Sequence, residues 1–246
     1  MSDERKHAFR TRRFSPRNIS LDLDPSGQDI VHSENLIYKN SLLYPSDPEP
    51  PEFGRARWNF EQDVIDSWGN YNGNDRTNAG YTTDAPIGSH AKSFSGNGDQ
   101  VTFGNVLSIN SDTTISLWVK PQSTSFLIPM VHKDGSYQFH INGEGKFWFG
   151  TFGSRLLSQS ISWKSRQWYH CAVVWEHGSR TATFYRNGKP IGSDTGYDSP
   201  SGGGTLRLGY KEDGGDWLNG SLDDVRYYNT ALSPEQVNSL YKLGSD

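Results

Sequence analysis

The sequence of 246 residues lacks several features that would place it in a familiar class. It has one cysteine, Cys171, so no intrachain disulfide can cross-link the fold. No apolar run approaches the roughly 20 residues that a transmembrane helix needs, so membrane insertion is not expected. The net charge of −4 argues against a general affinity for nucleic acid. The hydrophobic content is also low, at 33%.

The chain is instead rich in aromatic side chains and glycine. It contains 8 Trp, 12 Tyr and 12 Phe, and each of these rings can bury a large apolar area. Its 26 Gly suit a fold with many tight turns. The aromatic rings therefore offset the low hydrophobic content and allow a substantial core.

The composition changes near residue 55. Residues 1–55 hold six of the twelve prolines and show no persistent apolar periodicity. Such a segment cannot bury enough surface to offset its own ordering entropy. We predict an extended N-terminal arm over residues 1–55, with apolar docking points at 30–31 and 36–38, followed by one domain over 56–246. The arm is expected to tether the domain to neighbouring protein chains, and the protein to form a homo-oligomer.

Short strands separated by turn signals fill the predicted domain. Residues 114–119 alternate with period two and end before a proline. Residues 137–141 and 146–149 flank a four-residue hairpin connection, and Asn-Gly at 187–188 follows the run at 181–185. This pattern predicts an all-β fold, a two-sheet antiparallel jelly-roll sandwich. The predicted core includes Phe94, Ile115, Leu117, Val119, Val173, Phe184, Leu208, Leu222 and Val225.

A short C-terminal helix is predicted after the last strand. Ser233 fits the N-cap, Pro234 fits the first helical position, and Gln236 completes a capping box. The side chains that would then share one helical face are Val237, Leu240 and Tyr241.

Seven short sequence blocks occur in a defined order along the chain. They are Trp-Asn-Phe-Glu at 58–61, Asp-Ser-Trp-Gly-Asn-Tyr-Asn at 66–72, Phe-Ser-Gly-Asn-Gly-Asp at 94–99, Ile-Ser-Leu-Trp-Val-Lys-Pro at 115–121, Trp-Tyr-His at 168–170, Phe-Tyr-Arg-Asn-Gly at 184–188 and Leu-Asp-Asp-Val-Arg-Tyr-Tyr at 222–228. In this order they resemble the laminin-G-like, concanavalin-A-like jelly-roll domain, over roughly residues 56–243. The resemblance implies a domain that binds ligands far more often than it catalyses.

The resemblance also implies calcium binding, since a calcium ion is often seen in this superfamily and takes oxygen ligands. The matching positions are Asp66, Asn70 and Asn72 in the opening loop and Asp223 on the closing strand. Two structural alternatives stay open. Asp66 and Asn70 could cap a turn through side-chain hydrogen bonds, and Asp223 could pair with Arg226 or with a backbone N–H.

Aromatic residues in polar loops are candidates for stacking on sugar rings. Tyr71, Tyr197 and Trp217 each lie in a loop rich in Gly, Asn or Asp, where a core role is harder to supply. The alternative for any aromatic residue of a sandwich is a place in the core. These three residues are the predicted ligand-binding residues for a glycan.

Catalysis by a carboxylate pair is less favoured. Glu61, Asp63 and Asp66 superficially resemble the Glu-x-Asp-x-x-Glu signature of concanavalin-A-like glucanases. The third acid is Asp, and the run lies at the opening strand and loop, whereas the catalytic signature belongs on a concave inner strand. No catalytic residues are predicted.

Three functions follow, in order of preference. The first is a non-enzymatic structural or adhesion protein that displays a jelly-roll head on a larger assembly, such as a turret, decoration or fibre-associated component at a virion surface. It rests on the polar arm, on the ligand-binding family and on a start at Met1 without an export signal. The second is a carbohydrate-binding module of an extracellular or cell-surface protein, and the third is a glycan-cleaving enzyme.

Overall fold

The computed structural model describes residues 51–245 except 53, 76, 78, 126, 152–153, 198–199, 201 and 212–214, together with the backbone of 22–23 and 29–30. The chain divides into two compact units, residues 1–47 and 48–246. In the first unit, β1 (Asp22–Leu23) pairs antiparallel with β2 (Asp29–Ile30). The side chains of the predicted docking points lie outside the described residues.

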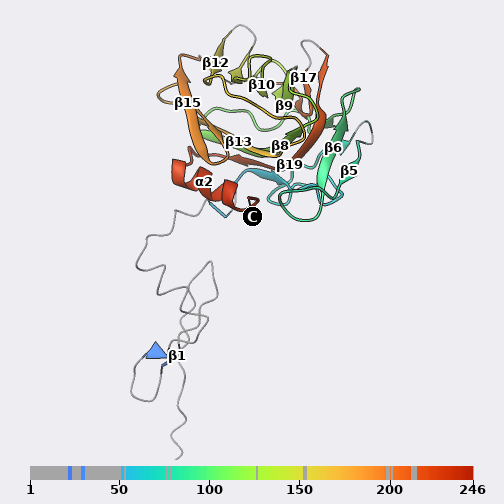
Figure 1. Cartoon of the computed structure of the whole chain (residues 1–246). Coiled ribbons are helices and arrows are strands. Elements are labelled where there is room, and N and C mark those ends of the chain that lie inside the picture. The colour runs from blue at the N-terminus through green and yellow to red at the C-terminus, as the bar shows by residue number, and fades with distance from the viewer. Residues whose placement is uncertain are drawn as a thin grey trace, which may run out of the picture. The chain divides into compact units, whose positions relative to one another are not determined.

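The second unit is a sandwich of two antiparallel sheets, which confirms the predicted all-β jelly-roll fold. One sheet has seven strands, in the order β12 (Arg155–Leu157), β11 (Phe147–Gly150), β10 (Tyr137–Ile141), β9 (Ile128–Lys133), β16 (Leu206–Leu208), β7 (Val101–Thr102) and β4 (Asn74–Asp75). Figure 1 shows this sheet stacked above the second sheet.

The second sheet has eight strands, and the longest of them, β19, lies inside it. The order is β15 (Lys189–Thr195), β14 (Thr181–Arg186), β13 (Tyr169–Glu176), β8 (Thr113–Pro121), β19 (Asn219–Tyr228), β6 (Ala91–Ser95) and β5 (Tyr81–Thr82), with β3 (Ala56–Trp58) also paired to β19. A separate hairpin joins β17 (Tyr210–Lys211) to β18 (Asp216–Trp217).

The core lies between the two sheets and is largely aromatic. All nine predicted core residues are buried, which confirms that part of the sequence interpretation. They pack with fully buried rings from both sheets, among them Trp58, Phe139, Phe149 and Trp175. Burial of one such side chain stabilises the fold by about 1.5–3 kcal/mol.

The predicted C-terminal helix is α2 (Pro234–Lys242), which lies on the outer side of the eight-stranded sheet (Figure 1). Ser233 accepts from the Gln236 N–H and the Gln236 side chain reaches back to the Ser233 N–H, so the predicted capping box is confirmed. Val237 and Leu240 pack into a second apolar cluster between helix and sheet. Among the described residues, no helix is long and apolar enough to span a membrane.

Trp118 shows how this helix completes the fold. Its neighbours on β8, Leu117 and Val119, point into the core, and alternation sends the Trp118 side chain to the opposite face. There the indole is only 3% exposed, since it packs against His170 and Tyr241 at ring-centroid distances of 5.4 and 5.7 Å. The indole is therefore buried on the outer face of the sheet, and its cover includes helix α2.

Candidate functional site

Strand register sorts the seven-stranded sheet into an apolar row and a polar row. The apolar row faces the core and consists of Val101, Leu208, Val131, Phe139, Phe149 and Leu156. The next row along the strands must face the other way, because side chains alternate. This outer row consists of Asn74, Thr102, Arg207, His132, Gln138, Gly150 and Arg155. The sheet thus presents a polar face opposite the core.

An ion pair fixes the middle of the outer row. Arg207 donates from Nε and Nη2 to the two oxygens of Asp134, at 3.1 and 3.0 Å. Its Nη1 donates to the side-chain oxygen of Gln100 at 2.9 Å. His132 Nε2 lies 3.2 Å from the same carboxylate. A bidentate pair of this kind has a defined geometry, so the Arg207 guanidinium is held in one position.

A stacked pair of aromatic rings adjoins this arginine. Tyr210 and Trp217 face each other across the β17–β18 hairpin, with centroids 4.2 Å apart and planes inclined by 25°. The Arg207 guanidinium carbon lies 5.7 Å from the Tyr210 ring centroid. Both rings are half-buried, so part of each meets solvent.

A pocket of about 320 Å³ opens on the other side of Arg207. Its lining is mostly polar and comprises Asn72, Asn74, Thr102, Phe103, Gly104, Thr205 and Arg207. Amides, hydroxyls and a guanidinium supply both donors and acceptors. The aromatic pair and this pocket, joined by Arg207, form the candidate site.

A second group lies on the same face, toward β12. His140 on β10 lies opposite Trp148 on β11, with ring centroids 4.9 Å apart. The Arg155 guanidinium lies over the Trp148 ring at 4.6 Å. Burial, together with the charges of Lys211 and His132, lowers the pKa of His140 to about 3. The imidazole is therefore neutral at physiological pH.

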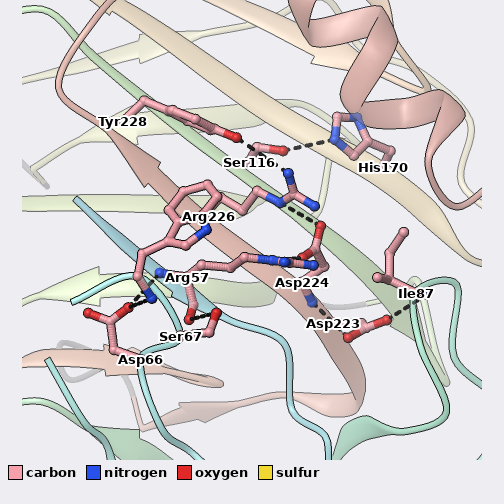
Figure 2. A network of polar contacts seen from close by, with 11 residues as sticks. Arg57, Asp66, Ser67, Ile87, Ser116, His170, Asp223, Asp224, Arg226 and Tyr228 are labelled. Carbon is pink, nitrogen blue, oxygen red and sulfur yellow. Dashed lines mark hydrogen bonds and ion pairs between the residues drawn. The ribbon is translucent and has the colours of Figure 1, made fainter. Parts of the chain in front are cut away.

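The outer side of the eight-stranded sheet carries a different polar network (Figure 2). Asp224 accepts hydrogen bonds from Arg57 Nε and Arg226 Nε, each at 2.7 Å. Ser116 Oγ lies 2.8 Å from His170 Nε2 deeper in the same network. Because Asp224 is almost fully buried and is bonded on both oxygens, this network stabilises the fold and offers little to a ligand.

The predicted metal ligands divide into two places in this structure. Asp66 accepts from the N–H groups of Arg57, Trp68 and Tyr71, the turn-capping geometry of the structural alternative. The side-chain oxygen of Asn72 accepts from the Asp66 N–H.

Asp223 is turned elsewhere, toward the N–H groups of Ile87 and Asp224. Figure 2 shows Asp66 at the backbone end of Arg57 and Asp223 beyond Asp224. No contact of Asn70 brings it toward Asp223 among the residues described. As arranged, the four residues do not fit one calcium ion, so calcium binding stays a prediction.

The three predicted glycan-binding aromatics have different surroundings. Trp217 lies in the candidate site. Tyr71 is half-buried and packs against the core, and its backbone precedes the pocket residue Asn72. Tyr197 is 2% exposed and donates its hydroxyl to the Ser136 carbonyl at 2.7 Å. The interpretation of Tyr197 as an exposed loop aromatic is therefore wrong, since the rings of Trp175 and Phe149 enclose it.

Sequence reasoning did not single out Arg207, Asn74 or Thr102. One signal was available for Arg207, which stands between Leu206 and Leu208 in a short buried strand. A charged residue between two core residues must point away from the core. Nothing in the sequence tells which strands lie beside it.

A family model described as the concanavalin A-like lectin/glucanases superfamily matches residues 95–238. The chain belongs to this superfamily. The match covers more than half of the chain and includes both the outer row from Thr102 onward and the β17–β18 hairpin.

Solved structures of similar proteins agree with this membership. Domain 4 of AbnA, a GH43 extracellular arabinanase from Geobacillus stearothermophilus in complex with arabinotriose, is 24% identical, with a TM-score of 0.61. The match covers 78% of the present chain and 98% of the arabinanase domain. The binding domain of Paraclostridial Mosquitocidal Protein 1 is 20% identical, with a TM-score of 0.60 over 76% of this chain and 51% of that one. The binding domain of botulinum neurotoxin serotype D is 18% identical, with a TM-score of 0.57 over 77% and 50%. At these identities the likeness shows the shared fold.

Proposed function

We propose that this protein is a non-enzymatic carbohydrate-binding protein whose ligand lies on the outer face of the seven-stranded sheet. The observation that carries the proposal is the stacked Tyr210–Trp217 pair, joined through Arg207 to a pocket lined by amides and hydroxyls. Sugars present apolar C–H faces and a rim of hydroxyls. An aromatic platform beside fixed polar groups suits both features, as in small-molecule sites generally.

Two similar structures support this choice of ligand class. The arabinanase domain was solved with arabinotriose, and a botulinum neurotoxin serotype D ligand-binding domain was solved with N-acetylneuraminic acid. Both are carbohydrates, although they differ in charge and size. They favour a glycan ligand and leave the sugar to be identified by experiment.

The carboxylates near the site favour binding over catalysis. Glycosidases commonly place two carboxyl groups about 5–9.5 Å apart around the scissile bond, and one of them must act as an acid or base. Asp134 is engaged by Arg207 and His132. Glu61 of the glucanase-like run instead accepts from the Ser89 backbone N–H at 2.8 Å, outside the candidate site.

Binding to a panel of soluble glycans, measured by titration calorimetry, tests the proposal. The panel should include arabinan, xylan, β-glucan and sialylated oligosaccharides. Trp217→Ala should weaken binding at least about tenfold, equivalent to about 1.4 kcal/mol. Trp168→Ala is the matched control, since this half-buried indole bonds to Asp84 beside the other sheet. Absence of binding to every glycan, or equal binding by Trp217→Ala, would overturn the proposal.

Display of this domain on a virion or another surface through residues 1–55 is a further part of the proposal. Its support is compositional, namely the proline-rich arm with a basic cluster at residues 5–13 beside an acidic chain. A glycan-binding head carried in this way would act in adhesion, at the virion surface or in an extracellular setting. Deletion of residues 1–50 tests this part separately from glycan binding.

A further inference from the structure

Two aromatic groups share the outer face of the seven-stranded sheet. Trp148 lies on β11, whereas Tyr210 lies on β17, which contacts β9. Two strand intervals separate β11 from β9 in the sheet order, which amounts to roughly 10 Å at about 4.8 Å per interval. The Trp148 and Tyr210 rings can therefore contact neighbouring units of one sugar chain.

His140 is the unusual residue beside Trp148. It is 1% exposed, and neither ring nitrogen has a hydrogen-bond partner among the described residues. Its neighbours on β10, Phe139 and Ile141, face the core, so alternation directs the imidazole to the outer face. Buried polar groups are normally paired, because an unpaired one destabilises the fold. The destabilisation caused by the unpaired His140 nitrogens calls for a functional explanation.

We infer that His140 and Trp148 form a second sugar subsite, so that the protein binds an extended oligosaccharide of several linked units. This inference rests on the proposed function. Trp148 supplies the apolar platform once the exposed Arg155 side chain, which lies over its ring at 4.6 Å, turns aside, and His140 exchanges hydrogen bonds with a hydroxyl of the unit above it. A terminal monosaccharide would fill only the Tyr210–Trp217 end.

The chemistry of a neutral imidazole fits a hydroxyl. One ring nitrogen donates a hydrogen bond and the other accepts one, and a sugar hydroxyl does both as well. A unit that lacks this hydroxyl leaves His140 unpaired, so binding discriminates against it strongly. Reaching the ring takes a side-chain rotation among its neighbours, a change that is common when ligands bind.

A substitution of His140 separates this role from a structural one. His140→Phe removes two unpaired polar atoms and keeps a ring of similar shape. We expect its melting temperature to equal or exceed that of the wild type, while its affinity for long oligosaccharides falls about tenfold. His140→Gln, which retains a donor and an acceptor, should recover part of that affinity.

The decisive experiment measures affinity against chain length. The probes are arabinotriose and arabinohexaose, together with the trimer and hexamer of any other glycan that the panel identifies. The wild type should bind hexamers about tenfold more tightly than trimers, and Trp148→Ala should bind both equally. Trp217→Ala should bind both at least about tenfold more weakly, and the control Trp168→Ala should bind both as the wild type does.

The outcomes distinguish the two proposals. If hexamers and trimers bind equally well and neither Trp148→Ala nor His140→Phe changes binding, the second subsite is wrong while the first stands. If His140→Phe lowers the melting temperature markedly and leaves hexamer affinity unchanged, His140 is a structural residue. If no glycan binds, the proposed function and this inference fall together.

Discussion

Asp224 and Arg226 stand two residues apart on β19, and their side chains meet in a buried ion pair with Arg226 Nε 2.7 Å from Asp224 Oδ2. Asp224 has a φ of 46°, and the register of β19 against β8 shifts between Asp223 and Arg226. Asp tolerates this left-handed conformation better than most residues. The irregular backbone thus belongs to the strand segment that carries the ion pair.

Asp224→Asn should destabilise the domain by about 3–5 kcal/mol. The substitution keeps the size of the side chain but leaves Arg226 buried without its counter-charge, which is strongly unfavourable. Urea unfolding measures the loss. Glu176→Gln at the exposed end of β13 is the control for removing one negative charge. A loss below about 1 kcal/mol would mean that water reaches the pair and screens it.

Trp118→Ala should cost about 3–5 kcal/mol of unfolding free energy, because it leaves a cavity beneath α2. The double variant with Tyr241→Ala should lose less than the sum of the two single losses, since the two rings pack together. Denaturant unfolding of the four proteins gives this coupling. Additive losses would show that the helix does not depend on the indole.

Asp223 should make stability fall as pH rises toward 8. Burial, together with the charges of Asp224 and Glu61, raises the pKa of its carboxyl from the usual 3.8 to about 8. Because the folded pKa exceeds the unfolded one, the folded state holds a proton that the unfolded state has lost between about pH 4 and 8. This stabilisation is complete below about pH 4 and disappears through pH 8.

The measurement is the melting temperature of the wild type and Asp223→Asn from pH 5 to pH 8. The wild type should melt at lower temperature as pH rises, and the variant should show a flatter dependence. The slope of melting temperature against pH is the quantity to compare. A general loss of stability lowers the whole curve without changing this slope. Parallel curves would show that Asp223 titrates near its ordinary pKa.

Calcium binding is tested by melting in chelator and in excess calcium. An ion that binds only the folded state stabilises it by about 2.7 kcal/mol at a concentration one hundred times its dissociation constant. If the predicted site forms, calcium raises the melting temperature and Asp66→Asn abolishes the rise. Superimposed curves in both solutions would leave Asp66 and Asp223 as capping residues only.

Deletion of residues 1–50 tests the arm. If the arm tethers the head, the truncated protein should lose higher-order assembly while its head melts cooperatively. Light scattering and calorimetry give the two readouts. Residues 54–55 are retained because Arg55 donates its backbone N–H to the Tyr227 carbonyl at 2.7 Å. A truncated head that aggregates or loses its transition would place the arm within the fold.

Local sequence rules were enough for much of the fold. The Ser233–Gln236 capping box involves residues three apart, so its geometry is written in adjacent sequence. Asn187 and Gly188, with φ values of 51° and 72°, form the tight turn expected between β14 and β15. Alternation likewise identified the core side of β8 correctly.

The candidate site depends on register between distant strands, which local rules do not provide. Arg207, Thr102 and Asn74 become neighbours only because β16, β7 and β4 pair side by side. Tyr197 was misassigned for a different reason. Its sequence neighbours are polar, but in the fold the rings of Phe149 and Trp175 pack against it and bury it. Trp217 was recognised, but its stacking partner Tyr210 comes from the other strand of the hairpin.

The position of β19 has a consequence for biosynthesis. It is the last strand in the described sequence, yet it lies between β8 and β6 and also pairs with β3. During synthesis, β8 and β6 are complete before residues 219–228 leave the ribosome. Until then, the backbone edges that β19 will cover are unpaired and can pair with the wrong strand. Closure of the sheet is therefore a late, long-range event, and a frameshift or stop before residue 219 would remove the strand that joins β8 to β6.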